Sequence, residues 1–563
     1  MASEKRAGLS DNGDRTLIIL SILIGVVVGL TTVAFILLTG RLAARMYPPE
    51  SAAWRRLVVP VLGSLVSGYL LYRYFPNARG SGIPQTKFAI FLRDGYIPLK
   101  TPLGKFLCCS ISLASGIALG REGPSVQIGA GISSVIGRRF GLSPANVKAL
   151  VPVGCSAALA AAFNTPIAAV LFAMEEILGD MHAPVLGSVV LSSATSWMVL
   201  HLLLGDDPLF HPPAYKLVHP LEFGIYAILG IAGGLASVCF VKLLLNIRLW
   251  FMKLPKSTVW LQPVAGGLLV GALGWFVPGV LGVGYDFVDR VLSGDVSVKI
   301  VLLMAALKLI ATPVCYSSGN AGGIFGPSLF IGATIGAAVG STAHSLLPGI
   351  TAGPGAYALV GMGAAFAGIV RTPLTSVIMI FEMTRDYSII VPLMIANLVS
   401  FFISRRMQPE PIYEALALQE GVHLPAGAAR EEFAWIHVGD IVDREAALLP
   451  EEADFEKAKA FLMEKECNSW PVGDGQGCVR GVVAMQQIET APQGATLVRH
   501  LVHANSDFPH VHMDHAASQV LERMRRSSVD SMPVVSRTDI HQSLGVVTLA
   551  GILAAYKMKA GVS

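Results

Sequence analysis

The feature that most constrains this chain is the long run 309–370, which contains no Asp, Glu, Lys or Arg. A helix crosses the bilayer core with about 20 apolar residues, so this run predicts more than one crossing. Only 14% of the 563 residues are charged, against about 25% in an average globular protein. The sequence therefore predicts an all-α polytopic membrane domain. Further apolar segments that predict spans are 16–40, 149–174, 183–205, 223–241, 257–285 and 387–404.

Positive charges flank this apolar region at both ends. Lys5, Arg6 and Arg15 precede the first span, and Arg405 and Arg406 follow the last. Lys and Arg gather on the cytoplasmic side of membrane proteins, so we expect cytoplasmic termini, an even number of crossings and a location in the plasma (inner) membrane. The first apolar segment has no small-residue cleavage site after a short core, which favours a retained helix over a signal peptide.

Composition excludes several other classes of protein. The net charge of +4 is small and mixed, which argues against a nucleic-acid partner. The seven cysteines are scattered, and neither Cys467 nor Cys478 has a neighbour at a zinc spacing, so neither a disulfide framework nor a metal site is predicted. The sequence contains neither His-Glu-x-x-His nor Gly-x-Ser-x-Gly, which argues against an enzyme. A divalent-cation transporter would need acidic clusters in its spans, and 309–370 has none.

Beyond Arg406 the charges become dense and the apolar runs shorten to strand length, which predicts a soluble domain. Within it, SWPV at 469–472 recurs as SMPV at 531–534. Such a repeat predicts two copies of a small α/β unit. The predicted parts of the chain are an N-terminal segment 1–15, a membrane domain 16–406, a linker 407–432, and the two copies at 433–490 and 496–558.

The membrane domain also contains a repeat. GPSVQIGA at 123–130 recurs as GPSLFIGA at 326–333, with most positions identical. Two Thr-Pro sequences, at 165–166 and 372–373, have nearly the same separation, and each precedes a glutamate, Glu175 in the first case and Glu382 in the second. Repeated halves with interrupted apolar segments are typical of transporters whose broken helices meet near the bilayer midplane. Chance similarity among Gly-rich helices remains the alternative.

Three apolar segments place Pro shortly after flexible Gly: GSGIP at 80–84, GREGP at 120–124 and GGIFGP at 322–327. Proline favours the first turn of a helix, so each segment predicts a loop that enters a helix N-terminus. The free N–H groups and the positive dipole end of such a helix favour an anion. Three converging ends would hold a dehydrated anion weakly enough to let it leave again.

An acidic residue, Glu122, lies inside one of these segments. Its ionised carboxylate would compete with a bound anion and act as a plug, whereas protonation or an arriving anion would release it and couple anion passage to a proton. An ionisable residue in a membrane segment is a functional hypothesis by default. The alternative is an ion pair with Arg121 at a membrane edge. Glu175 and Glu176 end a charge-free run, and each is either a proton acceptor or a solvated charge at a helix end.

Together, the three motifs and the two repeats resemble the chloride channel and transporter (CLC) family over nearly the whole chain. The resemblance implies chloride transport across a lipid bilayer by a homodimer, in which each subunit has a pore built from two inverted halves with many tilted and broken helices. It also implies a set of chloride-binding residues, in which Ser81 rather than proline favours chloride over nitrate. On the residues alone, Ser81 could be a turn hydroxyl and Tyr413 an interfacial aromatic. The implied chloride-binding residues are Ser81, Gly123, Ile324, Phe325 and Tyr413.

Exchangers in this family carry a second glutamate on the cytoplasmic side that relays protons, and Glu176 falls on that position. Lys105, which precedes Glu122, matches a basic position of exchangers, which implies a long-range positive potential. The resemblance therefore favours a chloride/proton exchanger in which Glu122 is the gate and Glu176 the proton relay. A passive, voltage- or ligand-regulated chloride channel of the same fold is the alternative.

The tail resembles a pair of CBS domains, which often bind adenine nucleotides. Three places after the end of the second strand, where an acidic residue commonly contacts ribose, this chain has Gln487 in the first copy and Gly551 in the second. Neither residue offers a carboxylate to a ribose hydroxyl. Nucleotide binding and a purely structural, dimerising role therefore stay equally open, and no other cofactor is predicted.

Overall fold

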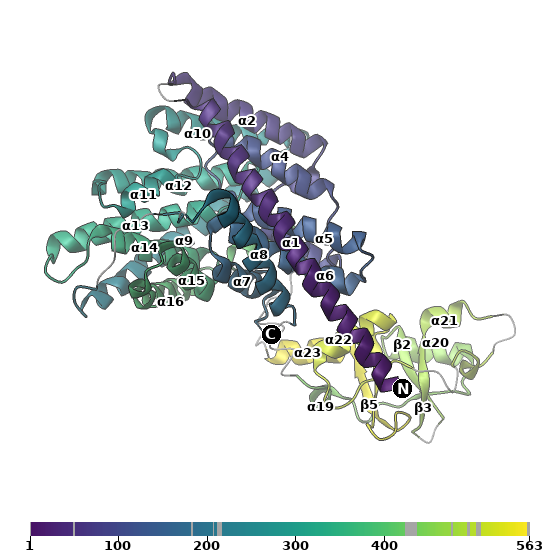
Figure 1. Ribbon diagram of the computed structural model, residues 1–563. Helices are drawn as coiled ribbons and strands as arrows, with labels where there is room; N and C mark the ends of the chain where they lie inside the picture. Colours follow the sequence, from purple (N-terminus) through teal and green to yellow (C-terminus); the bar gives the residue numbers. More distant parts are fainter. Residues whose placement is uncertain are drawn as a thin grey trace. The chain divides into compact units, whose positions relative to one another are not determined.

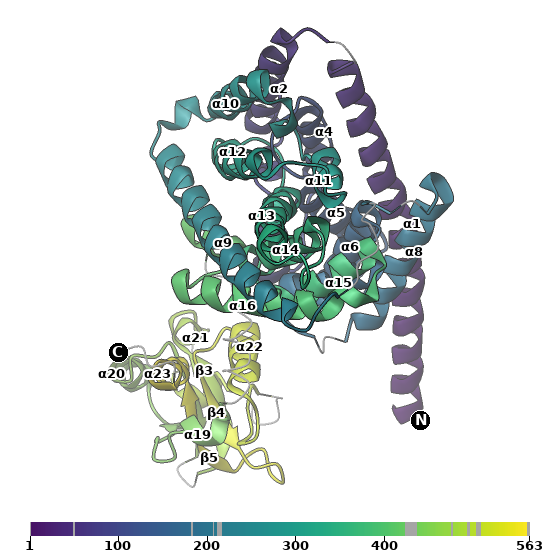
Figure 2. The same ribbon diagram turned by 90° about the vertical axis from the view of Figure 1, so that its left-hand side faces the viewer.

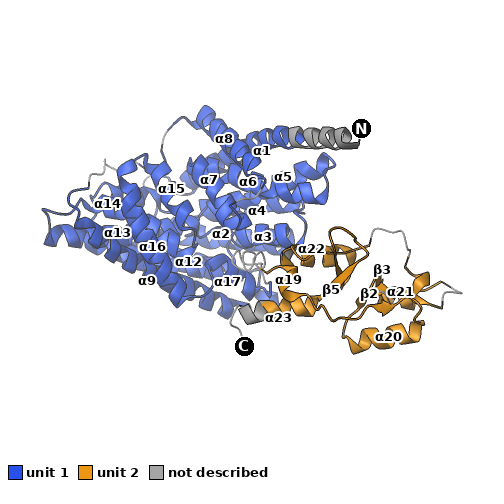
Figure 3. Cartoon of the chain, turned by 90° about the horizontal axis from the view of Figure 1, so that it is seen from below, with its two compact units in different colours: residues 1–424 blue, residues 425–563 orange. Residues whose placement is uncertain are grey.

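The chain forms two compact units, Met1–Leu424 and Pro425–Ser563 (Figure 3). In its described part the first unit is helical, and the second combines helices with small sheets. The computed structural model describes residues 2–48, 51–181, 184–206, 208–210, 217–422, 436–474, 477–492, 496–502 and 508–559.

The first unit contains two series of helices that follow one another along the chain (Figure 1). The first series is α1 (Ala2–Met46), α2 (Trp54–Arg73), α3 (Ile83–Leu92), α4 (Lys100–Ala114), α5 (Glu122–Arg139), α6 (Pro144–Phe163), α7 (Pro166–Phe172) and α8 (Leu186–Leu204). The second series is α9 (Glu222–Met252), α10 (Gln262–Phe276), α11 (Tyr285–Leu292), α12 (Val298–Ser317), α13 (Phe325–Leu346), α14 (Pro354–Ile369), α15 (Pro373–Thr384) and α16 (Ile390–Met407).

The two series pack in the same way, which confirms the duplication predicted from the sequence. Helix α1 packs along α8 and α6, and α9 packs along α16 and α14. Helix α5 lies against α6, and the corresponding α13 lies beside α14 (Figure 2). The repeat in the sequence therefore relates whole helices, and each helix of the first half has a counterpart in the second.

Close helix crossings occur at glycines in both halves. A Cβ atom added to Gly129 of α5 would collide with the carbonyl oxygen of Gly154 in α6. In the second half, a Cβ atom on Gly332 of α13 would collide with the carbonyl oxygen of Gly361 in α14. Small residues allow membrane helices to approach closely, because no side chain separates the backbones. The same device therefore fixes α5 on α6 and α13 on α14.

Several described helices are long and apolar enough to cross a membrane, and α10, α14 and α15 are shorter apolar helices. The charge-free run 309–370 divides among the end of α12, all of α13 and all of α14, so it forms several helices, and its repeated crossing of the membrane stays a prediction. By length and composition the candidate spans in the described residues are the seven segments Thr16–Met46, Pro144–Phe163, Leu186–Leu204, Glu222–Met252, Val298–Ser317, Phe325–Leu346 and Tyr387–Gln419.

The apolar run 149–174 is broken where the sequence suggested one continuous span. Helix α6 ends before Asn164, whose φ of 60° lies in the left-handed region, and α7 starts at Pro166. A left-handed residue ends a helix, and proline cannot continue the preceding hydrogen-bond ladder. Arg371, with φ of 69°, and Pro373 make the same break between α14 and α15.

Helix α1 begins at Ala2, so its backbone is continuous across the predicted division between 1–15 and the membrane domain, which stays a prediction. The predicted boundary between the membrane domain and the linker differs from the extent of the first unit. Helix α17 (Ile412–Gln419) belongs to the first unit, although it falls in the predicted linker 407–432. This helix packs against α3 and α9 and buries Tyr413, so apolar burial extends the first unit beyond 406. Residues 423–435 lie outside the described part.

The second unit contains two small sheets, which confirms the predicted α/β class. In the first sheet, β2 pairs parallel with β1 and antiparallel with β3, and in the second β4 pairs antiparallel with β5. The strands are β1 (Leu449–Pro450), β2 (Ser469–Gly473), β3 (Val479–Ala484), β4 (Ser531–Val535) and β5 (Ser543–Thr548). The helices are α19 (Val438–Ile441), α20 (Phe455–Glu464), α21 (Met485–Glu489), α22 (Ala517–Ser527) and α23 (Leu549–Lys559).

The two copies in this unit meet at the first residues of β2 and β4, Ser469 and Ser531. Ser531 Oγ donates a hydrogen bond of 2.6 Å to the carbonyl oxygen of Ser469. The Asp530 carboxylate accepts hydrogen bonds from the N–H of Ser469 at 2.9 Å and from its hydroxyl at 2.7 Å. Ser469 and Ser531 are the first residues of SWPV and SMPV, so the repeated sequence forms the joint between the copies.

Candidate functional site

Two Gly-rich loops, one from each half, pair with each other directly before helix starts. Gly120 and Gly323 exchange two backbone hydrogen bonds, each of 2.7 Å, in an antiparallel bridge. Helix α5 begins just beyond the bridge at Glu122, and α13 begins just beyond it at Phe325. The prediction that these motifs lead into helix N-termini is confirmed. The positive ends of two helix dipoles therefore start from one shared backbone bridge.

The third Gly-rich loop, before α3, contacts the same place. A Cβ atom on Gly123 would lie only 2.7 Å from the carbonyl oxygen of Ser81 and 3.5 Å from Cα of Gly323. Gly82, with φ of 102°, would place a Cβ atom 2.8 Å from the carbonyl oxygen of Gly123. Only glycine fits backbone this close. The three motifs, far apart in the sequence, thus bring the starts of α3, α5 and α13 together.

The Glu122 side chain is fully buried at this meeting point. Its Oε2 accepts a hydrogen bond of 3.3 Å from the N–H of Gly326, in the first turn of α13. Its Oε1 accepts a hydrogen bond from the hydroxyl of Tyr285, and Arg121 Nε lies 4.0 Å from the same oxygen. The carboxylate is therefore held mainly by the second half of the protein and lies at the anion-favouring start of α13. The Arg121 pair considered from the sequence is thus present at 4.0 Å, but Tyr285 and Gly326 make the hydrogen bonds to the carboxylate.

Tyr285 was missed in the sequence analysis, although a signal for it exists. GVGY at 282–285 occupies the place in the second half that GSGI at 80–83 occupies in the first, and in both cases a helix starts directly after the second glycine. The loop before α11 is thus the counterpart of the loop before α3. In the first half this loop carries Ser81, and in the second half it leads to the hydroxyl that binds Glu122.

The hydroxyl groups of Ser81 and Tyr413 are both buried, and neither has a hydrogen-bond partner in the described part of the structure. Helix α17, which carries Tyr413, packs against α3, which starts beside Ser81. A buried hydroxyl without a partner costs free energy, so such groups call for an explanation such as a ligand. The Tyr413 phenol is also within electrostatic range of both Glu122 and Glu176.

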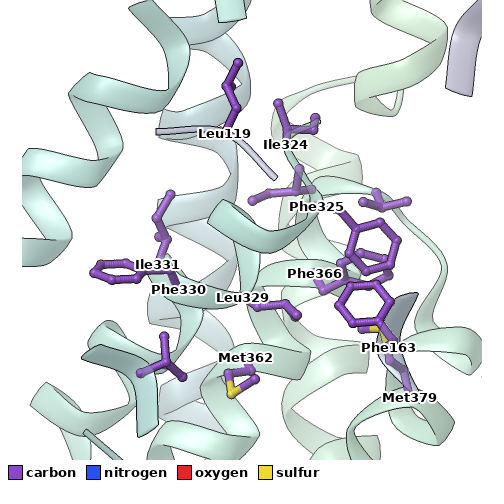
Figure 4. Close-up of a cluster of buried hydrophobic side chains, with 14 of the residues drawn as sticks. Leu119, Phe163, Ile324, Phe325, Leu329, Phe330, Ile331, Met362, Phe366 and Met379 are labelled. Carbon is purple, nitrogen blue, oxygen red and sulfur yellow. The ribbon is translucent and has the colours of Figure 1, made fainter. Parts of the chain in front are cut away.

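Ile324 and Phe325, the other predicted chloride-binding residues, form the start of α13. The ring of Phe325 lies 4.8 Å from that of Phe163 and 4.3 Å from that of Phe366, centroid to centroid, in a buried hydrophobic cluster (Figure 4). The first N–H groups of a helix have no partner within the helix. Ile324 and Phe325 can therefore offer backbone N–H groups while the Phe325 side chain anchors the helix start.

Glu176 lies in a π-helical turn, Ala173–Leu178, that packs against α3. Its side chain is buried, and its Oε1 lies 2.9 Å from Nζ of Lys87 on α3. Lys87 was not identified from the sequence, because the pairing depends on how α3 packs. Among the described residues Glu122 and Glu176 do not hydrogen-bond to each other, so the two predicted proton-transfer residues are separate sites.

The neighbouring Glu175 has a structural role instead. It accepts hydrogen bonds from the N–H of Thr375 at 2.8 Å and from its hydroxyl at 2.6 Å, at the start of α15. In return, Glu382 at the end of α15 accepts hydrogen bonds from Ile167 N–H at 2.9 Å and Ala168 N–H at 2.7 Å, at the start of α7. Each half thus caps a helix of the other. Glu175 thus caps a helix, whereas the proton-relay role of Glu176 stays a prediction.

Lys105 is fully buried and donates a hydrogen bond of 2.8 Å to the carbonyl oxygen of Gly80. Its counterpart in the second half, Lys308, is equally buried and donates to Gly282 at 2.6 Å and to Val280 at 3.1 Å. Each lysine therefore holds the Gly-rich loop of its own half. The long-range potential that the resemblance implies for Lys105 stays a prediction.

A cavity of about 510 Å³ opens beside Gly80. Its lining includes Arg79, Arg93, Arg248 and Lys256, whereas its acidic residue, Glu420, is paired with Arg248 at 2.6 Å. An excess of positive charge in a concave space raises the local concentration of anions. The cavity therefore suits an aqueous approach of anions to the loop that carries Ser81.

In the second unit, the two positions where a ribose-binding acid was considered serve helix starts. The Gln487 amide oxygen accepts a hydrogen bond of 2.9 Å from Ala484 N–H. Gly551 N–H donates to Thr548 Oγ1 at 3.0 Å. Neither position presents a carboxylate, so the residues present do not fit the expected ribose contact.

Comparison with known proteins identifies the family. The model of the family described as voltage gated chloride channel matches residues 63–405, and that of the CBS domain matches residues 498–557. The chain belongs to the CLC family of voltage gated chloride channels. The resemblance read from the three Gly-rich motifs is confirmed. This CLC chain is an integral, multi-pass membrane protein whose tail contains a CBS domain.

Curated relatives and solved structures agree with this assignment. A protein of Ralstonia nicotianae named putative chloride channel protein ClcB-like is 34% identical over 64% of this chain and 85% of that protein. The H(+)/Cl(-) exchange transporter ClcA of Vibrio campbellii is 32% identical over 63% of this chain and 77% of that protein.

Two crystal structures are similar to this CLC chain. That of a slow cyanobacterial Cl⁻/H⁺ antiporter is 27% identical, with a TM-score of 0.66 over 72% of this chain and 97% of that one. That of a eukaryotic CLC transporter is 22% identical, with a TM-score of 0.66 over 95% of this chain and 97% of that one. The second likeness extends the shared fold to nearly the whole chain.

Proposed function

We propose that this protein exchanges chloride for protons across a membrane, with Glu122 as the gate and Glu176 as the proton relay. The observation that carries the proposal is the position of the Glu122 carboxylate. It is buried where the starts of three helices meet, and it accepts a hydrogen bond from Gly326 N–H of the opposite half. An ionised side chain in a site that favours anions is a tethered competitor of chloride.

Chloride binding follows from the groups around this site. The Ser81 and Tyr413 hydroxyls, together with the N–H groups of Ile324 and Phe325, would bind the dehydrated ion without a full positive charge. The unpartnered hydroxyls support this assignment, because a chloride ion would satisfy both. Gly123 contributes by allowing the close approach of backbone that a side chain would prevent.

Exchange requires that chloride and protons use Glu122 in turn. When Glu122 is ionised, its carboxylate occupies the anion site and blocks passage. Protonation removes its charge, so that the side chain leaves the site and chloride enters. The reverse step returns the proton. Glu176 would deliver protons on the other side, and its burial beside Lys87 supports a group that is shielded from bulk water and has a fixed partner for its ionised form.

The relatives support exchange over passive conduction, because the ClcA proteins are named H(+)/Cl(-) exchange transporters. The ClcB-like relative is named a putative chloride channel, which favours the passive channel as the second candidate. A homodimer with one pore in each subunit, in the plasma membrane, with both termini in the cytoplasm, completes the proposal.

A reversal potential separates the two candidates. The full chain is reconstituted in a planar bilayer under a chloride gradient, and a pH gradient is then added. Exchange predicts that the reversal potential moves with the pH gradient, whereas a channel would ignore protons. Glu176→Ala should make the reversal potential follow chloride alone while chloride movement continues. A Glu176→Ala variant with unaltered coupling would remove Glu176 from the mechanism.

A further inference from the structure

The Tyr285 side chain lies in a fixed position against the Glu122 carboxylate. Tyr285 is the first residue of α11 and is half-buried, and its hydroxyl donates to Glu122 Oε1. Its ring packs edge to face against Phe210, with 5.5 Å between centroids, and the Arg121 guanidinium lies 5.8 Å from the same ring's centroid. The hydroxyl therefore meets the carboxylate because the ring is held by two neighbours.

The loop before Tyr285 is fixed as well. Lys308 Nζ donates hydrogen bonds to the carbonyl oxygens of Val280 and Gly282, at 3.1 and 2.6 Å. Gly284 has φ of 90°, and a Cβ atom there would lie 2.7 Å from the Phe330 ring, so glycine is needed to start α11 in this direction. The backbone that presents Tyr285 is thus set by a buried lysine and a left-handed glycine.

The same arrangement in the first half serves a different purpose. There Lys105 holds Gly80, and the loop presents Ser81 and then α3. The duplicated loop has Val283 where the first has Ser81, so it lacks that hydroxyl, but it gains one shortly afterwards at Tyr285. The two loops have diverged, so that one carries a predicted chloride ligand and the other a donor to the gate.

We propose that Tyr285 is the positioning residue that holds the ionised Glu122 in the anion site, and that its hydrogen bond sets how readily a proton or chloride releases the gate. This inference rests on the proposed function of Glu122. A hydroxyl donor stabilises a carboxylate over a carboxylic acid. Without it, the gate would open at a lower proton concentration and compete less well with chloride.

Other groups around Glu122 bear on its protonation too. Arg121 lies at the start of the same helix, Tyr413 on α17 is within electrostatic range, and α13 contributes the Gly326 N–H. Of these, Tyr285 and Gly326 make the hydrogen bonds to the carboxylate. Only the hydroxyl of Tyr285 can be deleted by changing a side chain, because the Gly326 donor belongs to the backbone.

The test is the pH profile of chloride efflux from liposomes that contain the full chain, measured for Tyr285→Phe. Losing a hydrogen bond to a charged group changes the pH at which that group takes up a proton by about one to two units. The pH profile of chloride efflux should therefore shift to higher pH by that amount. Tyr357→Phe is the matched control, because it deletes another buried tyrosine hydroxyl, 2.9 Å from the Glu222 carboxylate and outside the site. Tyr357→Phe should leave the profile in place.

A Glu122→Ala background separates this inference from the proposed function. In that background Tyr285→Phe should change nothing further, because its acceptor is absent. A wild-type profile for Tyr285→Phe, with coupling still lost in Glu122→Ala, would overturn the role of Tyr285 and leave the gate intact. Coupling that survives Glu122→Ala would overturn the gate itself. Tyr285→Met also removes the hydroxyl and fills the space flexibly, so it decides the question if the phenylalanine variant does not fold.

Discussion

Lys87 and Glu176 form a buried ion pair, with 2.9 Å between Nζ and Oε1. The pair joins α3, which starts beside the predicted chloride ligand Ser81, to the turn that carries the predicted proton relay. The charge of Glu176 is therefore balanced by a lysine on the helix that starts at the proposed anion site. Helix α3 thus connects the proposed chloride site with the proposed proton relay.

Replacing Lys87 should alter proton coupling without abolishing chloride transport. In Lys87→Met, the buried Glu176 loses its counter-charge, and an unpaired buried carboxylate favours its protonated form. Coupled proton flux in liposomes should therefore have its pH profile shifted to higher pH. Lys299→Met, which removes an exposed lysine on α12, is the control and should match the wild type. A Lys87→Met profile that coincides with that of Lys299→Met would show that the pair has no bearing on the relay.

Glu175 caps the start of α15 in the opposite half, so replacing it should affect stability, whereas replacing the adjacent Glu176 should affect proton coupling. Glu175→Gln weakens the cap of α15 and should lower thermal stability by about 1 kcal/mol, the usual value of a cap, while proton coupling persists. Glu382→Gln, at the equivalent position of the second half, should behave in the same way. Thermal unfolding in detergent and proton flux in liposomes check both. Loss of coupling in Glu175→Gln would contradict the assignment of the relay to Glu176 alone.

The close helix crossings at Gly129 and Gly332 predict that an added methyl group destabilises each half of the membrane domain to a similar extent. A methyl group at Gly129 or at Gly332 collides with backbone, which can move only by separating the helices. Gly129→Ala and Gly332→Ala should each destabilise the protein by about 1 to 3 kcal/mol. Gly187→Ala on α8, where the added methyl group meets open space, is the matched control. Thermal unfolding of the three variants is the measurement, and equal midpoints would mean that these crossings do not depend on glycine.

The joint between the two repeated copies of the second unit can be tested by proteolysis of the full chain. Asp530→Ala leaves the N–H groups of Asn468 and Ser469 without their acceptor. Of the two, Ser469 is buried, and an unpaired buried donor costs about 1 to 3 kcal/mol, so the tail should be cut several-fold faster at low protease concentration. Glu456→Ala removes an exposed acid of α20 and serves as the control. Equal cutting of the two variants would argue against a structural role for Asp530.

The sequence predicts the backbone of this site better than its side chains. The helix starts within 80–84, 120–124 and 322–327 could be predicted because glycine and proline act locally, through φ angles and missing donors. The repeat likewise predicted that the loops belong to equivalent halves. Aligning 282–285 with 80–83 would have pointed to Tyr285. Extending the same alignment to Lys105 would have pointed to Lys308.

Other features were not accessible from local patterns. Lys87 reaches Glu176 only because α3 packs on the turn Ala173–Leu178, a contact between positions far apart in the sequence. The break at Asn164 was hidden inside an apolar run, since hydrophobicity alone does not reveal a left-handed residue. Helix α17 was predicted as linker because its polar surroundings outweighed its short apolar face, which is nevertheless buried on α3 and α9.

The central claim is that one carboxylate, Glu122, is used by both chloride and protons. The most direct measurement is proton uptake driven by a chloride gradient in liposomes that contain Glu122→Gln, recorded together with chloride efflux. The account predicts that chloride efflux continues and becomes independent of pH, because the gate no longer carries a titratable charge, and that proton uptake disappears. Proton uptake that persists in Glu122→Gln would contradict the account.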